Sequence, residues 1–222
     1  MLVVTEEAYP LSYTEKGDNE VKGLATNFVK ELLLKANIEY EIKILPWSRA
    51  YKMAVEHENV LIYSIAKTSA RNEKFYWIGN ILNLNYHLFS LSSRKHDIVP
   101  KVANNYKNNS IGVISDSASH QHLKYLNYSN LIPVQNTDQL FEILKKKRVD
   151  LLLGSMLGIN YFVKRNQLSK DYFHRVHTFH NLEVKLYIAV SKKTDEKLVL
   201  RLKEAFDSLK DQDSFKQLST LI

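Results

Sequence analysis

Cysteine is absent from the sequence, and only six of its 222 residues are glycine. The lack of cysteine excludes disulfide bonds, thiolate metal ligands and cysteine nucleophiles. The glycines never adopt the spacing of a phosphate-binding loop, which excludes that mode of nucleotide binding. No run of apolar residues approaches the roughly 20 that are needed to cross a bilayer. The first residues also lack the basic and apolar regions of a signal peptide, so none is expected in this sequence.

Residue patterns for catalysis and metal binding are also missing. The segment around Ser155 lacks the second glycine of a nucleophile elbow. Glu6 and Glu7 are adjacent in an extended segment, so they point to opposite sides and make a poor acid–base pair. The eight histidines form no zinc-binding motif. We therefore expect no enzymatic activity, no metal site and no cofactor.

The formal net charge is +7, and the sequence pI is about 9.3. The densest basic run, residues 145–148, ends an expected amphipathic helix, where positive charge complements the helix dipole. A nucleic-acid-binding surface would need basic residues interleaved with aromatic ones on one face. We therefore expect no nucleic-acid partner, although the surplus favours anionic ligands weakly.

The order of the expected elements is that of an α/β protein. The first third alternates strands and helices, and the middle third repeats this logic, which predicts parallel strands covered by helices. Strands are expected at residues 2–5, 38–45, 60–65, 111–114, 149–154 and 184–190. Helices are expected at residues 24–34, from 46, after 115–119, from 137, at 156–166 and through most of 195–222. Residues 75–91 look like extended chain that passes from one unit to the next.

Polar and aromatic residues follow several of the expected strands, which is where α/β proteins bind ligands. Arg71 is the most informative of them, because a guanidinium holds a carboxylate through two parallel hydrogen bonds. An alternative is that Arg71 pairs with a surface acid such as Glu73. For Trp47 and Tyr13, packing in the core is about as plausible as lining a ligand site.

Residues 64–75 (SIAKTSARNEKF) resemble a signature of the bacterial extracellular solute-binding proteins, family 3. Other segments are similar to that family in order and spacing. These are residues 9–13 (YPLSY), 46–50 (PWSRA), 111–113 (IGV), 149–151 (VDL) and 187–190 (YIAV). The resemblance implies a type 2 periplasmic-binding-protein fold, in which each lobe is a mostly parallel sheet flanked by helices and two strand-like hinges join the lobes. The lobes would comprise residues 1–86 with 184–222, and residues 87–183.

The resemblance also implies a function. The protein would be a periplasmic monomer, its signal peptide removed, that closes over a small carboxylate-bearing solute and delivers it to an ABC transporter permease. Arg71 would hold the carboxylate of the solute. The expected ligand-binding residues are Glu7, Tyr13, Trp47, Ser64, Ala66, Arg71, Asp116, Ser117 and Ser155.

Two positions depart from the family pattern. The family usually has an aspartate after the late strand to hold the ammonium of an amino acid, and Ser155 stands there. The second-lobe loop usually reads Gly-Thr, and Asp116-Ser117 replaces it. The cationic end of the ligand therefore stays open. A ligand-sensing domain of a receptor and a small enzyme on the same scaffold are the alternatives to a transport protein.

Overall fold

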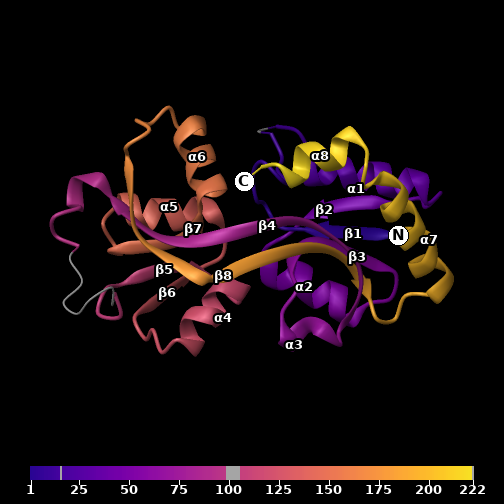
Figure 1. The fold of residues 1–222 in the computed structure, drawn as a ribbon, viewed down its shortest axis with the longest axis horizontal. Coiled ribbons are helices and arrows are strands. Elements are labelled where there is room, and N and C mark those ends of the chain that lie inside the picture. The colour runs from indigo at the N-terminus through magenta and orange to yellow at the C-terminus, as the bar shows by residue number, and fades with distance from the viewer. Residues whose placement is uncertain (16, 99–105, 222) are drawn as a thin grey trace. The chain divides into compact units, whose positions relative to one another are not determined.

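The computed structural model describes residues 1–15, 17–98 and 106–221. Its contacts divide the chain into two compact units, Met1–Asn83 with Lys185–Ile222, and Leu84–Val184. Two long strands, β4 (Phe75–Leu91) and β8 (Phe173–Ser191), each contribute residues to both units (Figure 1). The predicted α/β class, with mostly parallel strands flanked by helices, is confirmed.

The first unit is built on three parallel strands. β1 (Leu2–Thr5) lies between β2 (Glu41–Ile44) and β3 (Val60–Ala66), and β3 pairs antiparallel with the last part of β8. All seven residues of β3 are buried, as expected for a central strand with both faces covered. The helices of this unit are α1 (Leu24–Lys35), α2 (Trp47–Glu56), α3 (Ser69–Asn72), α7 (Glu196–Leu209) and α8 (Asp213–Ser219). In Figure 1, α1 and α8 cover one face of the sheet, and α2 and α3 cover the other.

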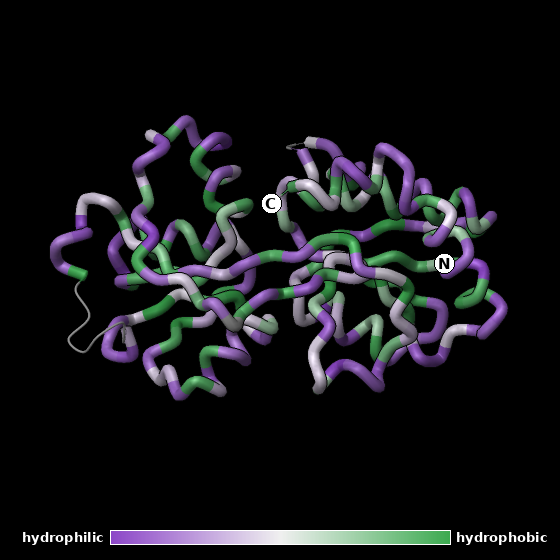
Figure 2. Tube along the Cα trace, in the orientation of Figure 1, coloured by the Kyte–Doolittle hydropathy of each residue, from purple (hydrophilic) through white to green (hydrophobic). Residues whose placement is uncertain are grey.

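The helix predicted at residues 24–34 is confirmed as α1. Its apolar residues recur at positions i, i+3, i+4, i+7 and i+8, which places them on one face of a helix. All five are buried, namely Ala25, Phe28, Val29, Leu32 and Leu33. Figure 2 shows the same pattern, with hydrophobic strands inside and mixed colours along the covering helices. Burial of this stripe on the sheet fixes how α1 packs.

The second unit repeats the plan. β5 (Ile111–Ile114) lies between β6 (Leu131–Val134) and β7 (Leu151–Ser155), all three parallel, and β4 pairs antiparallel with β7. The helices are α4 (Ala118–Tyr125), α5 (Thr137–Lys145) and α6 (Met156–Arg165), and a short 3₁₀ helix spans Ser92–Arg94. Asp150 joins two segments, because it accepts hydrogen bonds from the amide and hydroxyl of Ser110 and from Arg94.

Some expected elements differ in extent. The strand expected at residues 38–45 is confined to β2, and that expected at 184–190 is the end of the longer β8. The strand β6 was not expected; it contains Pro133, which cannot donate to a ladder and is tolerated because β6 is an edge strand. The expected C-terminal helix is two helices, and Ile222 lies outside the described residues.

None of the helices in the described part of the chain is long and apolar enough to span a membrane.

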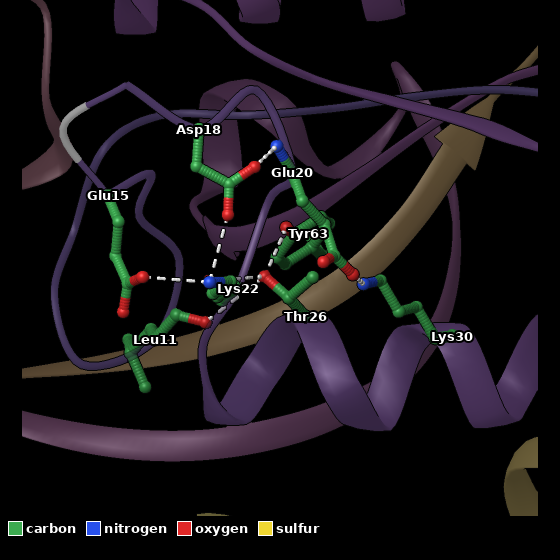
Figure 3. A network of polar contacts seen from close by, with 8 residues as sticks. All are labelled: Leu11, Glu15, Asp18, Glu20, Lys22, Thr26, Lys30 and Tyr63. Carbon is green, nitrogen blue, oxygen red and sulfur yellow. Dashed lines mark hydrogen bonds and ion pairs between the residues drawn. The ribbon is translucent and has the colours of Figure 1, made fainter.

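Polar contacts fasten the segment between β1 and α1 to the rest of the first unit (Figure 3). The hydroxyl groups of Thr26 and Tyr63 lie 2.8 Å apart, both buried, and join α1 to β3. Lys22 pairs with Glu15 at 2.8 Å and with Asp18 at 2.9 Å. Lys22 thus holds the turn of this segment together, and Thr26 ties the helix that follows it to β3.

Gly79 offers a test of how closely α7 packs on β4. A Cβ atom at this position would overlap the ring of Phe206 on α7. We expect Gly79→Ala to destabilise the protein by about 1–3 kcal/mol through overpacking, measured by urea unfolding. In the double variant with Phe206→Leu, the combined loss is expected to be smaller than the sum of the two single losses. Additive losses would contradict this packing account.

Candidate functional site

Three loops of the first unit meet at the carboxyl edge of its parallel strands. Glu6 and Glu7 follow β1, and Trp47 begins α2 after β2. Ser64 and Ala66 lie near the end of β3. Because β2, β1 and β3 are parallel neighbours, these strand ends lie along one edge of the sheet. This is the edge at which open α/β sheets bind ligands.

Arg71 is buried at this edge. It lies on the short helix α3, only 3% of its surface is exposed, and its Nη1 donates to the carbonyl oxygen of Ala66 at 3.2 Å. The guanidinium carbon lies 4.8 Å from the centre of the Trp47 ring and 5.1 Å from that of Tyr51. Both aromatic faces attract the cation. The structure thus brings together three of the predicted residues: Arg71, Trp47 and Ala66.

The alternative partner for Arg71 is not engaged. Glu73 is exposed, and its carboxylate accepts a hydrogen bond from the side chain of Asn72 at 2.9 Å. Among the described residues, no ion pair joins Glu73 to Arg71. An ion pair with Glu73 therefore does not account for the burial of the guanidinium.

Two hydroxyl groups near Arg71 are buried without a hydrogen-bond partner in the described part of the chain. Ser64 sits in a β-bulge, where the pairing of β3 with β8 shifts between Tyr63 and Ile65, and its φ is 58°. The bulge leaves the Ser64 Oγ unpartnered, and the Oγ1 of Thr68 is in the same condition. An unsatisfied buried polar group costs about 1–3 kcal/mol. Such groups next to a buried cation are suited to a polar ligand.

The carboxyl group of Glu6 has a shifted pKa. Burial raises the pKa of its carboxyl group to about 7, although the positive charge of Arg71 opposes the rise. Desolvation therefore outweighs the attraction of the nearby cation. The carbonyl oxygen of Glu6 accepts a hydrogen bond from the Ser12 hydroxyl at 2.7 Å, which fixes its backbone.

Glu7 and Tyr13 occupy the segment that follows β1. Both are partly buried. The Tyr13 ring lies 4.2 Å from that of Tyr9, and its backbone forms a bridge with Lys22. Burial and the neighbouring Tyr9 raise the pKa of the Tyr13 phenol. Their binding role stays a prediction.

The predicted residues of the second unit lie at the equivalent edge of its own sheet. Asp116 and Ser117 follow β5, and Ser155 ends β7, the parallel neighbour of β5. The Ser117 Oγ accepts from the amide of His120 at 3.1 Å, and the Ser155 Oγ accepts from the amide of Gly158 at 3.2 Å. Each of these serines therefore caps a helix, α4 or α6.

Asp116 is exposed, has a φ of 56° and accepts a hydrogen bond from the Ser115 hydroxyl at 3.1 Å. Its amide donates to the Nδ1 atom of His120, also at 3.1 Å, which requires that nitrogen to be unprotonated. Burial and the nearby Lys124 lower the pKa of His120, in keeping with a neutral ring. His120 thus supports the loop that carries two of the predicted residues.

The structure adds four residues to the neighbourhood of the predicted ones: Glu6, Tyr51, Thr68 and His120. The helical spacing of Trp47 and Tyr51 (i, i+4) is a signal that places both on one helix face. For the other three, no signal in the sequence shows burial, a missing partner or the direction of a ring nitrogen. Within the ranges that the structure describes, no group of His, Asp or Glu residues is arranged to hold a metal ion.

The family model of the bacterial extracellular solute-binding proteins, family 3, matches residues 1–220. The chain belongs to this family. A search of curated protein sequences finds no significant match. The family relationship predicted from residues 64–75 and the accompanying segments is therefore confirmed.

Solved structures share the fold of this family 3 protein at low sequence identity. A histidine kinase sensor domain with similarity to periplasmic binding proteins superposes with a TM-score of 0.83 at 15% identity, covering 98% of this chain and 93% of its own. An ancestral arginine-binding protein bound to arginine gives 0.81 at 18%, with 98% and 95% covered. An amino acid ABC transporter substrate-binding protein from Streptococcus pneumoniae, bound to L-arginine, gives 0.79 at 16%, with 98% and 92% covered. The predicted periplasmic-binding-protein fold is thereby confirmed.

The raised pKa of Glu6 predicts a pH-dependent stability. Between the ordinary pKa of 4.5 and the folded value of about 7, the folded protein binds more protons than the unfolded chain. The contribution of Glu6 to stability is therefore complete below pH 4.5 and is lost as the pH rises through about 7. Because glutamine is neutral at every pH, Glu6→Gln is expected to melt several degrees above the wild type at about pH 8 and close to it at about pH 4.5.

The control for this measurement is Glu41→Gln, which replaces an exposed carboxylate on β2. It should melt close to the wild-type temperature at about pH 8, because the exposed ion pair with Lys43 that it removes contributes little to stability. If Glu6→Gln melts at or below the wild-type temperature at the higher pH, the Glu6 carboxyl is not held in its neutral form by the fold.

Proposed function

We propose that the protein is a periplasmic solute-binding protein that captures a small carboxylate-bearing solute, an amino acid or a related compound, for delivery to an ABC transporter permease. The two units would close over the solute by bending at β4 and β8, and the protein would act as a monomer without catalysis. The observation that carries the proposal is the buried guanidinium of Arg71 beside the hydroxyls of Ser64 and Thr68.

The chemistry of this group of residues favours a carboxylate. A guanidinium presents its N–H donors as a planar fork that matches the two oxygens of a carboxylate. Hydroxyl groups can accept or donate, so Ser64 and Thr68 can bind a polar group next to that carboxylate. The rings of Trp47 and Tyr51 lie 4.8 and 5.1 Å from the guanidinium carbon and pack against it, which limits its movement. A fixed fork loses less conformational entropy when it binds.

The relatives are consistent with a transport role. The ancestral protein binds arginine, and the S. pneumoniae protein belongs to an amino acid ABC transporter. Glu7, Tyr13, Asp116, Ser117 and Ser155 complete the proposed set of ligand-binding residues. Because the Ser155 hydroxyl accepts an amide hydrogen bond as a helix cap, it would offer the ligand its donor. The Ser117 hydroxyl also caps a helix and lies 3.1 Å from the hydroxyl of Ser119, with which it shares a hydrogen bond.

A ligand-sensing function is the second candidate, and it is supported by one of the similar structures. The similarity to a histidine kinase sensor domain, with a TM-score of 0.83, supports a ligand-sensing role for the same fold. Transport and sensing would use the same binding residues. They would differ in the partner that the ligand-bound protein contacts. Genes for a permease and an ATPase beside that of this protein would support transport, and a kinase or other output domain on the same polypeptide would support sensing.

The binding proposal is tested by screening amino acids, small peptides and organic acids for a rise in melting temperature, followed by calorimetry on each hit. Arg71→Met keeps most of the apolar stem and removes the charge, and it is expected to weaken carboxylate binding by at least about 2 kcal/mol, roughly 30-fold. Arg71→Lys, which keeps the charge and loses the fork, should bind with intermediate affinity.

The matched control is Arg148→Met, which removes an exposed arginine from the second unit and should bind with wild-type affinity. A far-ultraviolet circular dichroism spectrum shows whether each variant is folded. Undiminished affinity in folded Arg71→Met would overturn the proposed role of Arg71 as the carboxylate anchor.

A further inference from the structure

Two hydrogen bonds in opposite directions link His120 to the loop before α4. The His120 amide donates to the Ser117 Oγ at 3.1 Å, and the Asp116 amide donates to the Nδ1 atom of the His120 ring, also at 3.1 Å. A capping box works in the same way, because there the third residue of a helix reaches back to the backbone that precedes it. His120 is the third residue of α4, and only 4% of its surface is exposed. The ring is therefore a built part of this loop.

The backbone of Asp116 has a conformation that needs support. Its φ of 56° lies in the left-handed region, which is unfavourable for a residue with a side chain. Such a conformation persists where the surrounding contacts hold it. Two of these contacts are the His120 ring, which engages the backbone, and the Ser115 hydroxyl, which donates to the Asp116 carboxylate at 3.1 Å. Loss of the contact with the ring would leave the backbone of the loop less well held.

The hydrogen bond from Asp116 can form only while the Nδ1 atom of His120 is unprotonated. The neutral ring must therefore carry its proton on Nε2. When a proton binds to Nδ1, two N–H groups face each other and the hydrogen bond is lost. The new positive charge would also lie in the first turn of α4, where the helix dipole disfavours a cation.

Among the described residues, two charged groups act on the His120 ring. Lys124 lies on the same helix, and Asp116 lies on the loop. The strand on which α4 packs, β5, has no titratable side chain. Burial and the charge of Lys124 lower the pKa of His120 below its ordinary value of 6.5, and Asp116 opposes this change. The ring is thus neutral above pH 6.5 and takes up a proton only in more acidic solution.

We propose that His120 is the positioning residue of the loop that carries Asp116 and Ser117, and that uptake of a proton at its Nδ1 atom releases this loop and weakens solute binding. The effect on solutes rests on the proposed function, in which Asp116 and Ser117 bind the solute. The effect on the loop rests on the geometry of the second unit alone. Acid therefore weakens binding through the second unit, while Arg71 keeps its charge.

The loop is tested without any solute. Nuclear magnetic resonance of the whole ¹⁵N-labelled protein follows the ring nitrogens of His120 and the backbone amide of Asp116 between about pH 8 and about pH 5. Above pH 6.5 the Nδ1 signal should be that of an unprotonated ring nitrogen. At lower pH the Asp116 amide signal should move with the same midpoint as the His120 ring. Its protection from hydrogen exchange, corrected for the intrinsic rate, should fall about fivefold, the value of one typical hydrogen bond.

Two variants separate the hydrogen bond from the ring. His120→Asn keeps an acceptor oxygen close to the position of Nδ1 and takes up no proton, so the Asp116 amide should stay equally protected across this pH range. His120→Phe keeps a ring without the acceptor, and the protection of Asp116 should be low at every pH.

The matched control is His122→Asn. His122 is also partly buried on α4, and burial lowers its pKa as well, so it titrates in the same acid range. It lies two residues further on, on another face of the helix, with its ring 6.5 Å from that of Tyr125. This variant should keep the wild-type response of Asp116. A wild-type Asp116 amide that does not respond to the titration of His120 overturns the proposal, and this result needs no variant.

The effect on binding is measured with the amino acids, peptides and organic acids that bind in the calorimetric screen. Each is titrated at about pH 7.5 and about pH 5.5, on either side of the ordinary histidine pKa. The affinity of the wild type is expected to fall about threefold or more beyond the fall in His120→Asn, because protonation costs the loop one hydrogen bond. The comparison with His120→Asn removes the acid effects of other groups and of the solute itself. Equal falls in the two proteins would overturn the role of His120 in binding.

Failure of this proposal and failure of the proposed function can be told apart. If solutes bind while the Asp116 amide ignores the titration of His120, the binding function stands and the role of His120 falls. If the amide follows the ring but no solute binds, the positioning of the loop by His120 stands and the solute-binding function falls.

Discussion

A guanidinium with 3% of its surface exposed is the constraint around which the candidate site of the first unit is arranged. A buried cation is costly unless nearby groups compensate for its lost hydration. Two elements compensate it: Trp47 and Tyr51 of α2 offer ring faces, and the Ala66 carbonyl of β3 accepts a hydrogen bond. The parallel order of β2, β1 and β3 makes this possible, because it collects three separate loops at one edge.

Much of the fold could be predicted from the sequence, because periodicity records which face of an element is buried. The apolar stripe of α1, the buried run of β3 and the serine that caps α4 are local signals of this kind, and the structure shows all three. β6 escaped prediction because it is short, half exposed and interrupted by Pro133. The first half of β8 escaped because its histidines and polar residues hide the strand pattern, and the strand forms only through pairing with distant segments.

The candidate site was less predictable. Arg71 and Trp47 follow expected strands, and a resemblance to a family indicated the role of Arg71. The sequence does not show that burial raises the pKa of the Glu6 carboxyl, or that a bulge leaves the Ser64 hydroxyl unpaired. These properties depend on the burial of each polar group and on which polar atoms lie within hydrogen-bond distance of one another once the chain is folded. For Ser117 and Ser155, the structure adds that each hydroxyl caps a helix, which limits what either can offer a ligand.

The division of the chain into units has a consequence for how the protein is made. The first unit consists of two segments, and the strand that pairs with β3 lies in the second of them, residues 185–191. During synthesis the whole sequence of the second unit leaves the ribosome before the first unit can be completed. Until β8 has been synthesised, β3 has an unpaired apolar edge that includes Leu61 and Ile62. Nascent chains associate at edges of this kind. The nascent protein therefore has a long interval in which one sheet edge needs protection.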